Sequence, residues 1–414
     1  MNGYAIIILA LLLVDYVVHL LADYLNLKAL RAEVPKEFAG IFDADTYRRS
    51  QEYTRVYTRF ALLESTFFLG VTLAFWFSGG FPALDRLVRG WEFGPIGTGL
   101  AYIGILLLGR ALLSLPFKAY ATFGIEERFG FNRTSLSTFL TDLLKGLFLA
   151  LVLGGPLLAG ILAFFASIGP TAWLYCWGIT TLFTLGIQFI APTWILPLFN
   201  KFQPLPEGPL KEAILSYTRS VHFPVKEIMI MDGSRRSSKS NAFFTGWGKQ
   251  KRIALFDTLV EKHPVPELVA ILAHEVGHYK KKHLWQNLLL SILHQGVLFF
   301  LLSLFLTQQE LFAAFYMPQP AVYTGLIFFG LLYTPIETLL AILLQALSRR
   351  QEYAADRFAV ETTHHPEALI QALQKLSVHN LANLTPHPFY VLLHYSHPPI
   401  LERIKAIERY NDVS

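Results

Sequence analysis

Apolar residues occur along the chain in seven long, nearly uncharged stretches, separated by polar segments of unequal length. These stretches lie at 4–24, 59–80, 98–117, 143–167, 171–197, 284–306 and 322–347. A helix of about 20 residues crosses a hydrocarbon layer of about 30 Å. The first stretch lacks the basic start and the small-residue cleavage site of a signal peptide, so we interpret it as a retained span. The pattern predicts a mostly α-helical, polytopic membrane protein with seven transmembrane helices.

The polar segments divide the chain into four parts. Residues 1–200 contain five spans, 201–283 are polar and mixed, 284–347 contain two further spans, and 348–414 form a polar tail with helical periodicity. Residues 201–283 and 348–414 are therefore expected to form the soluble part of the protein together, with the last two spans inserted between them.

The first of these two soluble segments predicts a small β-hairpin followed by a helix. Residues 241–245 and 252–256 are β-like, and the turn-prone Gly246-Trp247-Gly248 joins them. From residue 265 the apolar positions recur at helical spacing, which predicts a helix to about residue 282.

Composition indicates that lipid solvates much of the chain. The 414 residues are 53% hydrophobic and 16% charged, which is more apolar surface than a soluble globule of this size buries. The net charge of +5 is spread over loops that are expected to meet anionic headgroups, so no nucleic-acid partner is expected. Cys176 is the only cysteine and lies in a span, which excludes a disulfide framework, a cysteine zinc site and a thiol nucleophile.

The distribution of Lys and Arg predicts the orientation in the membrane. Basic residues are abundant after spans one and three, in 201–283 and in the tail, whereas the loops after spans four and six have none. The positive-inside rule then places the N-terminus outside and the polar segments 201–283 and 348–414, with the C-terminus, in the cytoplasm. The compact chain, without large insertions, favours a bacterial inner membrane over an endoplasmic reticulum membrane.

The predicted helix at 265–282 contains the sequence His274-Glu275-Val276-Gly277-His278. Histidines at i and i+4 share one helical face and can bind a single zinc ion, and the glutamate between them can approach a zinc-bound water as general base. A third ligand is then required. His283 is one position short of a metzincin-type third ligand, and we interpret it as an interfacial residue rather than a ligand.

Glu352 and Asp356, after the seventh span, are a further i, i+4 pair. One could ligate the metal while the other accepts an N–H from a zinc-bound imidazole. On spacing alone, an ordinary solvated helix face is a slightly better interpretation of this pair.

Several motifs along nearly the whole chain resemble the type I CAAX prenyl protease family, integral-membrane zinc endopeptidases that trim prenylated C-termini. The motifs that carry this resemblance are Phe129-Gly130-Phe131-Asn132-Arg133-Thr134, Pro192-Thr193-Trp194-Ile195-Leu196-Pro197, Ser240-Asn241-Ala242-Phe243-Phe244-Thr245-Gly246, His274 to His278, Glu352 to Asp356, and Ser396-His397-Pro398-Pro399.

The resemblance implies roles for the matching residues. It makes His274, His278 and Glu352 the ligands of one zinc ion, and Glu275 the base. It makes Asp356 a partner of a zinc-bound histidine. It also implies that His397 and Arg403 are donors near the scissile carbonyl, and that Asn241 and Ala242 lie on an edge strand that pairs with the substrate. Without the resemblance, His397 would be interpreted as a structural histidine.

The family's fold is a zincin-like catalytic domain on seven helices that enclose a water-filled chamber. Charged residues in or near the spans fit either such a chamber or interhelical pairing, because facing lipid would cost several kcal/mol each. These residues are Asp15, Glu64, Arg110, Asp142, Lys145 and Glu337.

Three functions follow as alternatives. The first is CAAX-type processing of C-terminal, hydrophobic or lipidated peptides by a zinc metalloendopeptidase. The second is membrane-protein quality control of the heat-shock zinc protease type, whose members usually have fewer spans and a shorter N-terminal region. The third is a non-catalytic scaffold, which the presence of a complete set of ligand and base candidates disfavours. The expected partners are a peptide or protein substrate and membrane lipids.

Overall fold

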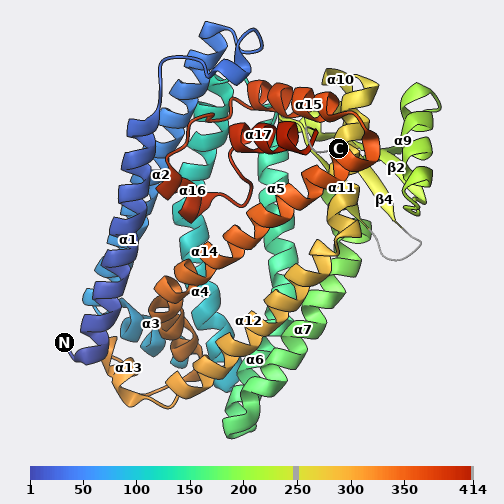
Figure 1. Ribbon diagram of the computed structural model, residues 1–414. Coiled ribbons are helices and arrows are strands. Elements are labelled where there is room, and N and C mark those ends of the chain that lie inside the picture. Colours follow the sequence, from blue (N-terminus) through green and yellow to red (C-terminus); the bar gives the residue numbers. More distant parts are fainter. Residues whose placement is uncertain (246–250, 412–414) are drawn as a thin grey trace.

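The computed structural model describes residues 1–245 and 251–411, and each predicted span is a helix in it (Figure 1). The seven helical spans run over Gly3–Ala29, Ala44–Phe77, Gly94–Glu126, Leu136–Ser167, Ala172–Phe199, His283–Phe305 and Val322–Thr363. Their main helices are α1 (Gly3–Ala29), α2 (Ala44–Phe77), α4 (Gly94–Tyr120), α5 (Leu136–Leu149), α6 (Gly155–Ser167), α7 (Ala172–Ile190), α8 (Leu196–Phe199), α12 (His283–Phe305) and α14 (Val322–Thr363).

Three spans contain a π-helical turn: η2 (Ala121–Glu126), η3 (Ala150–Gly154) and η5 (Ala191–Ile195). Pro116 lies inside α4, shortly before η2. A proline lacks the N–H that an α-helix needs, and such sites are common places for helices to kink or widen.

Several helices are longer than the apolar pattern predicts, and α2 and α14 exceed it the most. Helix α2 begins at Ala44 rather than near residue 59, and α14 continues to Thr363 rather than ending near residue 347. These polar extensions leave the apolar stretch and pack on soluble elements, α2 on α15 (Pro366–His379) and α14 on α11 (Val265–Lys280) and α17 (Ile400–Asn411). Hydropathy detects only the lipid-facing part of such a helix.

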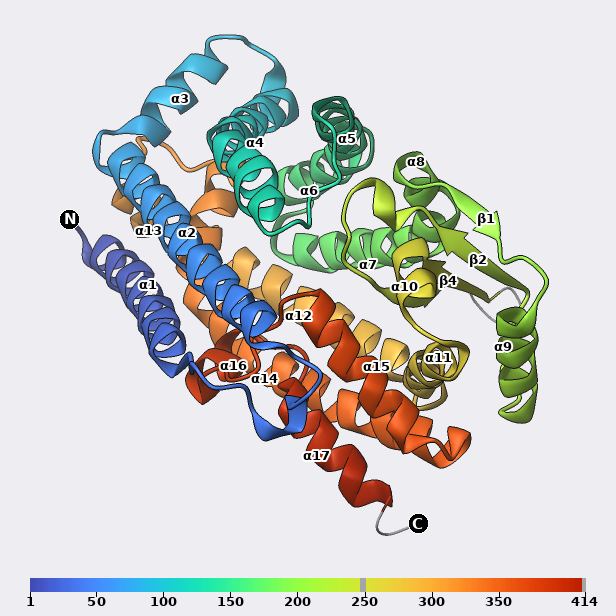
Figure 2. The same cartoon turned by 90° about the horizontal axis from the view of Figure 1, so that it is seen from above.

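Neighbouring spans contact one another in a ring, and α14 also contacts α4 and α6 (Figure 2). Contacts run from α1 to α2, through α3 (Gly80–Arg89) to α4, and then through α6, α7, α12 and α14 back to α1. Most of each span's apolar surface is not buried inside the protein, as expected for walls that face lipid on one side.

Several of the charged residues in these walls have polar partners. Asp15 accepts a hydrogen bond of 2.7 Å from Thr338, and Glu337 lies 3.2 Å from His294. Arg236 donates two hydrogen bonds of 2.8 and 2.9 Å to Asp142. Interhelical and interdomain pairing therefore accounts for part of the predicted set, within a ring that also encloses a chamber.

A small mixed sheet lies beside α11. The strands are β1 (Phe202–Pro204), β2 (Glu227–Met231), β3 (Ala242–Thr245) and β4 (Arg252–Phe256), in the order β1-β2-β4-β3. Strands β3 and β4 are antiparallel, which confirms the pairing of the predicted hairpin, while Gly246-Trp247-Gly248 lie outside the described residues. The sheet also has a parallel β2–β4 pair that the sequence did not predict.

The soluble part contains one main apolar core. It includes Ile253, Leu268, Leu272, Val276 and Leu373, each 5% exposed or less. The sheet, α11 and α15 contribute most of this core. The remaining helices are α9 (Pro209–Ser220), α10 (Asp257–Lys262), α13 (Gln309–Ala314) and α16 (Pro388–His394).

Candidate active site

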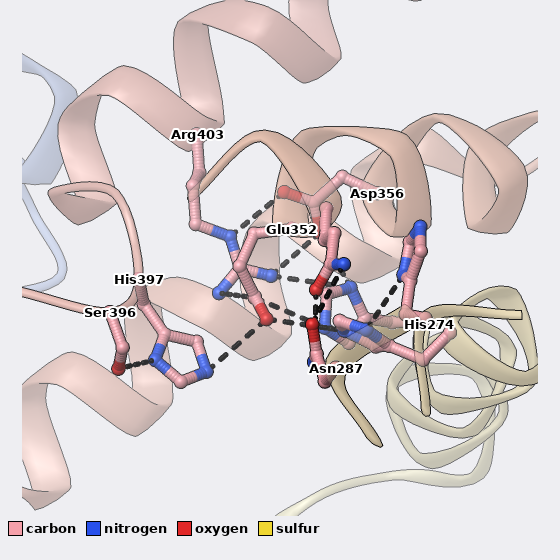
Figure 3. Close-up of polar contacts among 10 residues, drawn as sticks. His274, Asn287, Glu352, Asp356, Ser396, His397 and Arg403 are labelled. Carbon is pink, nitrogen blue, oxygen red and sulfur yellow. Dashed lines mark hydrogen bonds and ion pairs between the residues drawn. The ribbon is translucent and has the colours of Figure 1, made fainter. Parts of the chain in front are cut away.

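The candidate site forms where α11 crosses the soluble end of α14. Gly277 makes the crossing close, because a Cβ at this position would lie 3.0 Å from Ala355 Cα and 3.1 Å from the Ala355 carbonyl oxygen. The close approach brings His274 to Glu352 and Asp356 (Figure 3). It also brings His278 to Glu352. The solvated helix face is therefore the wrong interpretation of Glu352 and Asp356, which are 3% and 0% exposed.

Three side chains meet at this crossing. His274 Nε2 lies 3.2 Å from His278 Nε2 and 3.3 Å from Glu352 Oε2, and His278 Nε2 lies 3.1 Å from Glu352 Oε1. One ligand atom from each residue lies within 4.8 Å of the others. Two imidazoles and one carboxylate are a donor set typical of catalytic zinc sites.

The hydrogen bonds around these atoms fit a bound metal. Asp356 Oδ1 lies 2.8 Å from His274 Nδ1, so that Nδ1 carries a proton and, in the neutral ring that binds a metal, the lone pair is on Nε2. Glu352 Oε2 is buried and makes no hydrogen bond with any described residue. Buried acceptors without a partner are rare, and a metal ion held by Nε2 and Oε2 would satisfy both atoms.

Asp356 is held in turn by a buried arginine. Arg403 Nε and Nη2 donate to the two oxygens of Asp356 at 2.8 and 2.6 Å, and Arg403 Nη1 lies 3.6 Å from Glu352. Burial opposes the charge of Arg403, but Asp356 and Glu352 outweigh it and raise the pKa of the guanidinium. Burial also disfavours a charged His274, yet the hydrogen bond to Asp356 raises the pKa of this imidazole to about 9. A carboxylate partner of this kind makes an imidazole a stronger metal ligand.

Two further contacts at the site were not predicted. His283 is buried, and its Nδ1 lies 3.1 Å from Nδ1 of His278, so it is not the interfacial residue that the sequence suggested. Gln351, next to Glu352, exchanges hydrogen bonds of 3.0 and 3.2 Å with Asn287. These contacts tie the start of α12 to α11 and α14.

Glu275 and His397 face the same cavity. This cavity, of about 230 Å³, is also lined by Ser240, Asn241, Ala242 and Arg403. Burial raises the pKa of Glu275, although His274 and His278 act in the opposite direction. His397 Nε2 lies 3.3 Å from Glu352 Oε1, and its Nδ1 lies 3.0 Å from Ser396 Oγ (Figure 3).

The edge strand β3 lies beside α11. Its outer edge has no strand partner in the described part of the chain, as a peptide-binding edge requires. Every residue predicted for the site from the sequence thus lies in or directly behind one cavity. Asp356 and His278 stand behind its wall, and the others line it.

Comparisons with known proteins agree with this arrangement. A family model described as the CAAX prenyl protease N-terminal region, with five membrane helices, matches residues 23–201, and a model of peptidase family M48 matches residues 204–411. The chain is 35% identical over 406 residues to an Arabidopsis thaliana CAAX prenyl protease 1 homolog, covering 95% of each chain.

The chain belongs to the CAAX prenyl protease family of M48 peptidases.

Further relatives of this M48 peptidase extend the comparison. A Homo sapiens CAAX prenyl protease 1 homolog is 33% identical over 450 residues, covering 96% of this chain and 94% of the human one. The crystal structure of S. mikatae Ste24p superposes with a TM-score of 0.93 at 31% identity, covering 99% of this chain and 100% of that one. The M48 peptidase described here is therefore an integral, multi-pass membrane zinc metalloprotease, and its substrate is a peptide or protein. Neither quality control nor a scaffold is favoured as its function.

Proposed function

We propose that this protein is a CAAX-type processing endopeptidase with one zinc ion held by His274, His278 and Glu352. The observation that carries the proposal is the convergence of these three ligand atoms at a crossing where Asp356 fixes the tautomer of His274. The relatives that match along nearly the whole chain, including its five-span region, are named CAAX prenyl proteases. This favours CAAX processing over quality control.

Zinc held by these ligands supplies a Lewis acid that lowers the pKa of a water toward about 7 and polarises a carbonyl. Glu275 accepts the proton of the attacking water and delivers it to the leaving amine. His397 and Arg403, which line the same cavity, donate hydrogen bonds to the carbonyl oxygen as negative charge develops there.

Substrate binding follows from strand β3 and the chamber. An extended peptide adds to the edge at Asn241 and Ala242 by backbone hydrogen bonds, which place little demand on its side chains. The chamber holds an apolar or lipid anchor, for which each buried CH₂ contributes about 0.8 kcal/mol. The orientation consistent with the basic loops has the N-terminus outside and the site in the cytoplasm, in a bacterial inner membrane or an endoplasmic reticulum membrane.

The metal assignment is tested on purified protein. Elemental analysis is expected to give one zinc per chain in the wild type and a loss of zinc affinity in Glu352→Ala. Unchanged affinity in Glu352→Ala would remove Glu352 from the ligand set. Glu361→Ala, an exposed carboxylate on the same helix, is the matched control.

The substrate class is tested with a matched set of prenylated and unprenylated peptides. Product masses locate the cleaved bond, and lengthening the lipid is expected mainly to lower KM. A proline placed where the peptide must donate to the strand is expected to abolish cleavage, because proline has no N–H. Equal cleavage of polar, proline-containing and lipidated peptides would contradict the substrate model and leave the metal assignment intact.

A further inference from the structure

A second cavity, of about 180 Å³, lies next to the catalytic cavity. It forms where α1 and α2 meet the chain that follows α15. Four tyrosines and three asparagines make most of its wall: Tyr53, Tyr57, Tyr390, Tyr395, Asn26, Asn380 and Asn383. The elements that form it are far apart in sequence, and a hydrogen bond of 3.3 Å from Asn383 to Asn26 joins them directly.

Three connections make the two cavities neighbours. Asn380 lines both of them. Tyr395 lines the second cavity, and His397, two residues later, lines the catalytic one. Third, Lys239 donates a hydrogen bond of 2.9 Å to Tyr53 of the second cavity, and the next residue, Ser240, lines the catalytic cavity.

These connections indicate that the second cavity lies beyond the N-terminal end of β3, the strand to which the substrate is proposed to pair. Ser240 and Asn241 immediately precede β3 and line the catalytic cavity. A peptide paired with β3 and extending past Ser240 therefore comes to Asn380 and the tyrosine wall. An extended peptide advances about 3.3 Å per residue, so we expect a short extension of such a peptide to reach the second cavity.

The side chains that line this cavity are uncharged and mostly polar. No charged side chain lines this cavity within the described ranges. Lys239 and Glu126, which both contact Tyr53, pair with each other at 3.1 Å. The Oδ1 atom of Asn380 is buried and has no hydrogen-bond partner in the part of the chain that the structure describes. A buried acceptor of this kind is costly unless a ligand or water donates to it.

We propose that this cavity is a specificity subsite for an uncharged residue of the peptide substrate, read by Asn380 and the surrounding tyrosines. The inference rests on the proposed peptidase function and adds a substrate preference to it. A neutral side chain or backbone amide can hydrogen-bond with the Asn380 side-chain amide or the phenol hydroxyls and pack on the phenol rings. A carboxylate or ammonium would lose hydration without gaining an opposite charge, which opposes binding.

The test uses the full-length enzyme and peptides that share one cleavable core. The core is extended by one to three residues on either side, with Gln, Glu or Lys placed in turn at each added position. We expect one position, on one side of the cleaved bond, at which Gln exceeds both Glu and Lys by about tenfold in kcat/KM.

Two variants link that preference to the cavity. Asn380→Leu and Tyr57→Leu are each expected to reduce the Gln-over-Glu ratio at least threefold, with every rate normalised to the same variant acting on the unextended core. Tyr175→Leu changes an exposed tyrosine of α7 that lines neither cavity and is expected to keep the wild-type ratio.

The outcomes separate this inference from the function on which it rests. Cleavage of the core without any position that prefers Gln, or a preference that persists in both variants, overturns the subsite and leaves the peptidase function standing. If the wild type does not cleave the core, the proposed substrate class fails, and the subsite fails with it.

Discussion

Two buried aspartates at different places in the molecule make nearly the same contacts, yet only one of them serves the candidate active site. Asp356 on α14 accepts two hydrogen bonds from Arg403 and contacts the ring nitrogen of His274. Asp85 on α3 accepts a hydrogen bond of 2.8 Å from Arg89 and one of 2.5 Å from the Tyr323 hydroxyl. Both aspartates are 2% exposed or less.

The difference lies in the ring that each aspartate holds. An imidazole has two nitrogens, so the hydrogen bond that fixes one of them orients the other toward a ligand. A phenol has a single polar atom, and in Tyr323 the contact with Asp85 uses it. A buried Asp–Arg pair is therefore not in itself a sign of catalysis. Asp85 joins α3 to α14, whereas Asp356 directs the lone pair of His274 toward Glu352.

The mutation with the largest expected effect, Glu275→Gln, tests whether the site around Asp356 is catalytic. Glu275→Gln keeps the shape of the base but cannot accept the proton of water, so kcat is expected to fall by about 10²–10⁴-fold. Zinc content, measured by elemental analysis, is expected to stay at the wild-type level, since Glu275 is not among the proposed ligands. Glu361→Gln is the control, and a similar kcat in Glu275→Gln would mean that another group activates the water.

The next effect compares the two aspartates directly. Asp356→Asn weakens the partner of His274, and the loss of such a partner typically costs 10–100-fold in metal affinity or activity. Asp85→Asn is expected to leave zinc affinity unchanged. Competition with a chelator measures both variants in the same assay. Equal zinc affinities in the two variants would refute the distinction drawn from the two rings.

The third effect concerns stability rather than chemistry. Asp85→Asn weakens the charge-assisted contacts to Arg89 and Tyr323, and we expect the free energy of unfolding to fall by about 1–3 kcal/mol. Thermal unfolding in detergent measures the change, and kcat at low temperature is expected to match the wild type. Asp45→Asn, at an exposed surface pair with Arg48, should be neutral. A loss of kcat in folded Asp85→Asn protein would contradict a purely structural role.

The two aspartates also show how far the sequence predicts the molecule. Asp356 was predictable because it lies four residues after Glu352 and within a motif shared with a known family. Asp85 has no such spacing, since its partner Tyr323 is 238 residues away. The seven spans were predictable from their apolar length, but the polar extensions of α2 and α14 were not, because they depend on packing against the soluble part.

The same reasoning explains what was missed at the site. His283 was set aside because its spacing does not fit a ligand, yet the turn between α11 and α12 folds it back onto His278. Lys282, in that turn, has a left-handed backbone with a φ of 59°, which spacing rules for a single helix do not anticipate. The second cavity was not predictable either, because α1, α2 and the chain after α15 build it from distant segments.

The mutation with the smallest expected effect compares His283, the partner of His278, with Asp356, the partner of His274. His283 contacts His278 through a neutral ring nitrogen, and hydrogen bonds between neutral groups are roughly half as strong as those to a carboxylate. His283→Phe removes this contact while keeping an aromatic ring of similar shape in the buried position. Zinc affinity is therefore expected to fall only about three- to tenfold, less than in Asp356→Asn, and kcat at saturating zinc should remain within a few-fold of the wild type. His365→Phe, at an exposed histidine of the soluble part, controls for the aromatic substitution. A loss in His283→Phe as large as that in Asp356→Asn would show that both histidines need equally strong partners, and that the carboxylate does not set Asp356 apart.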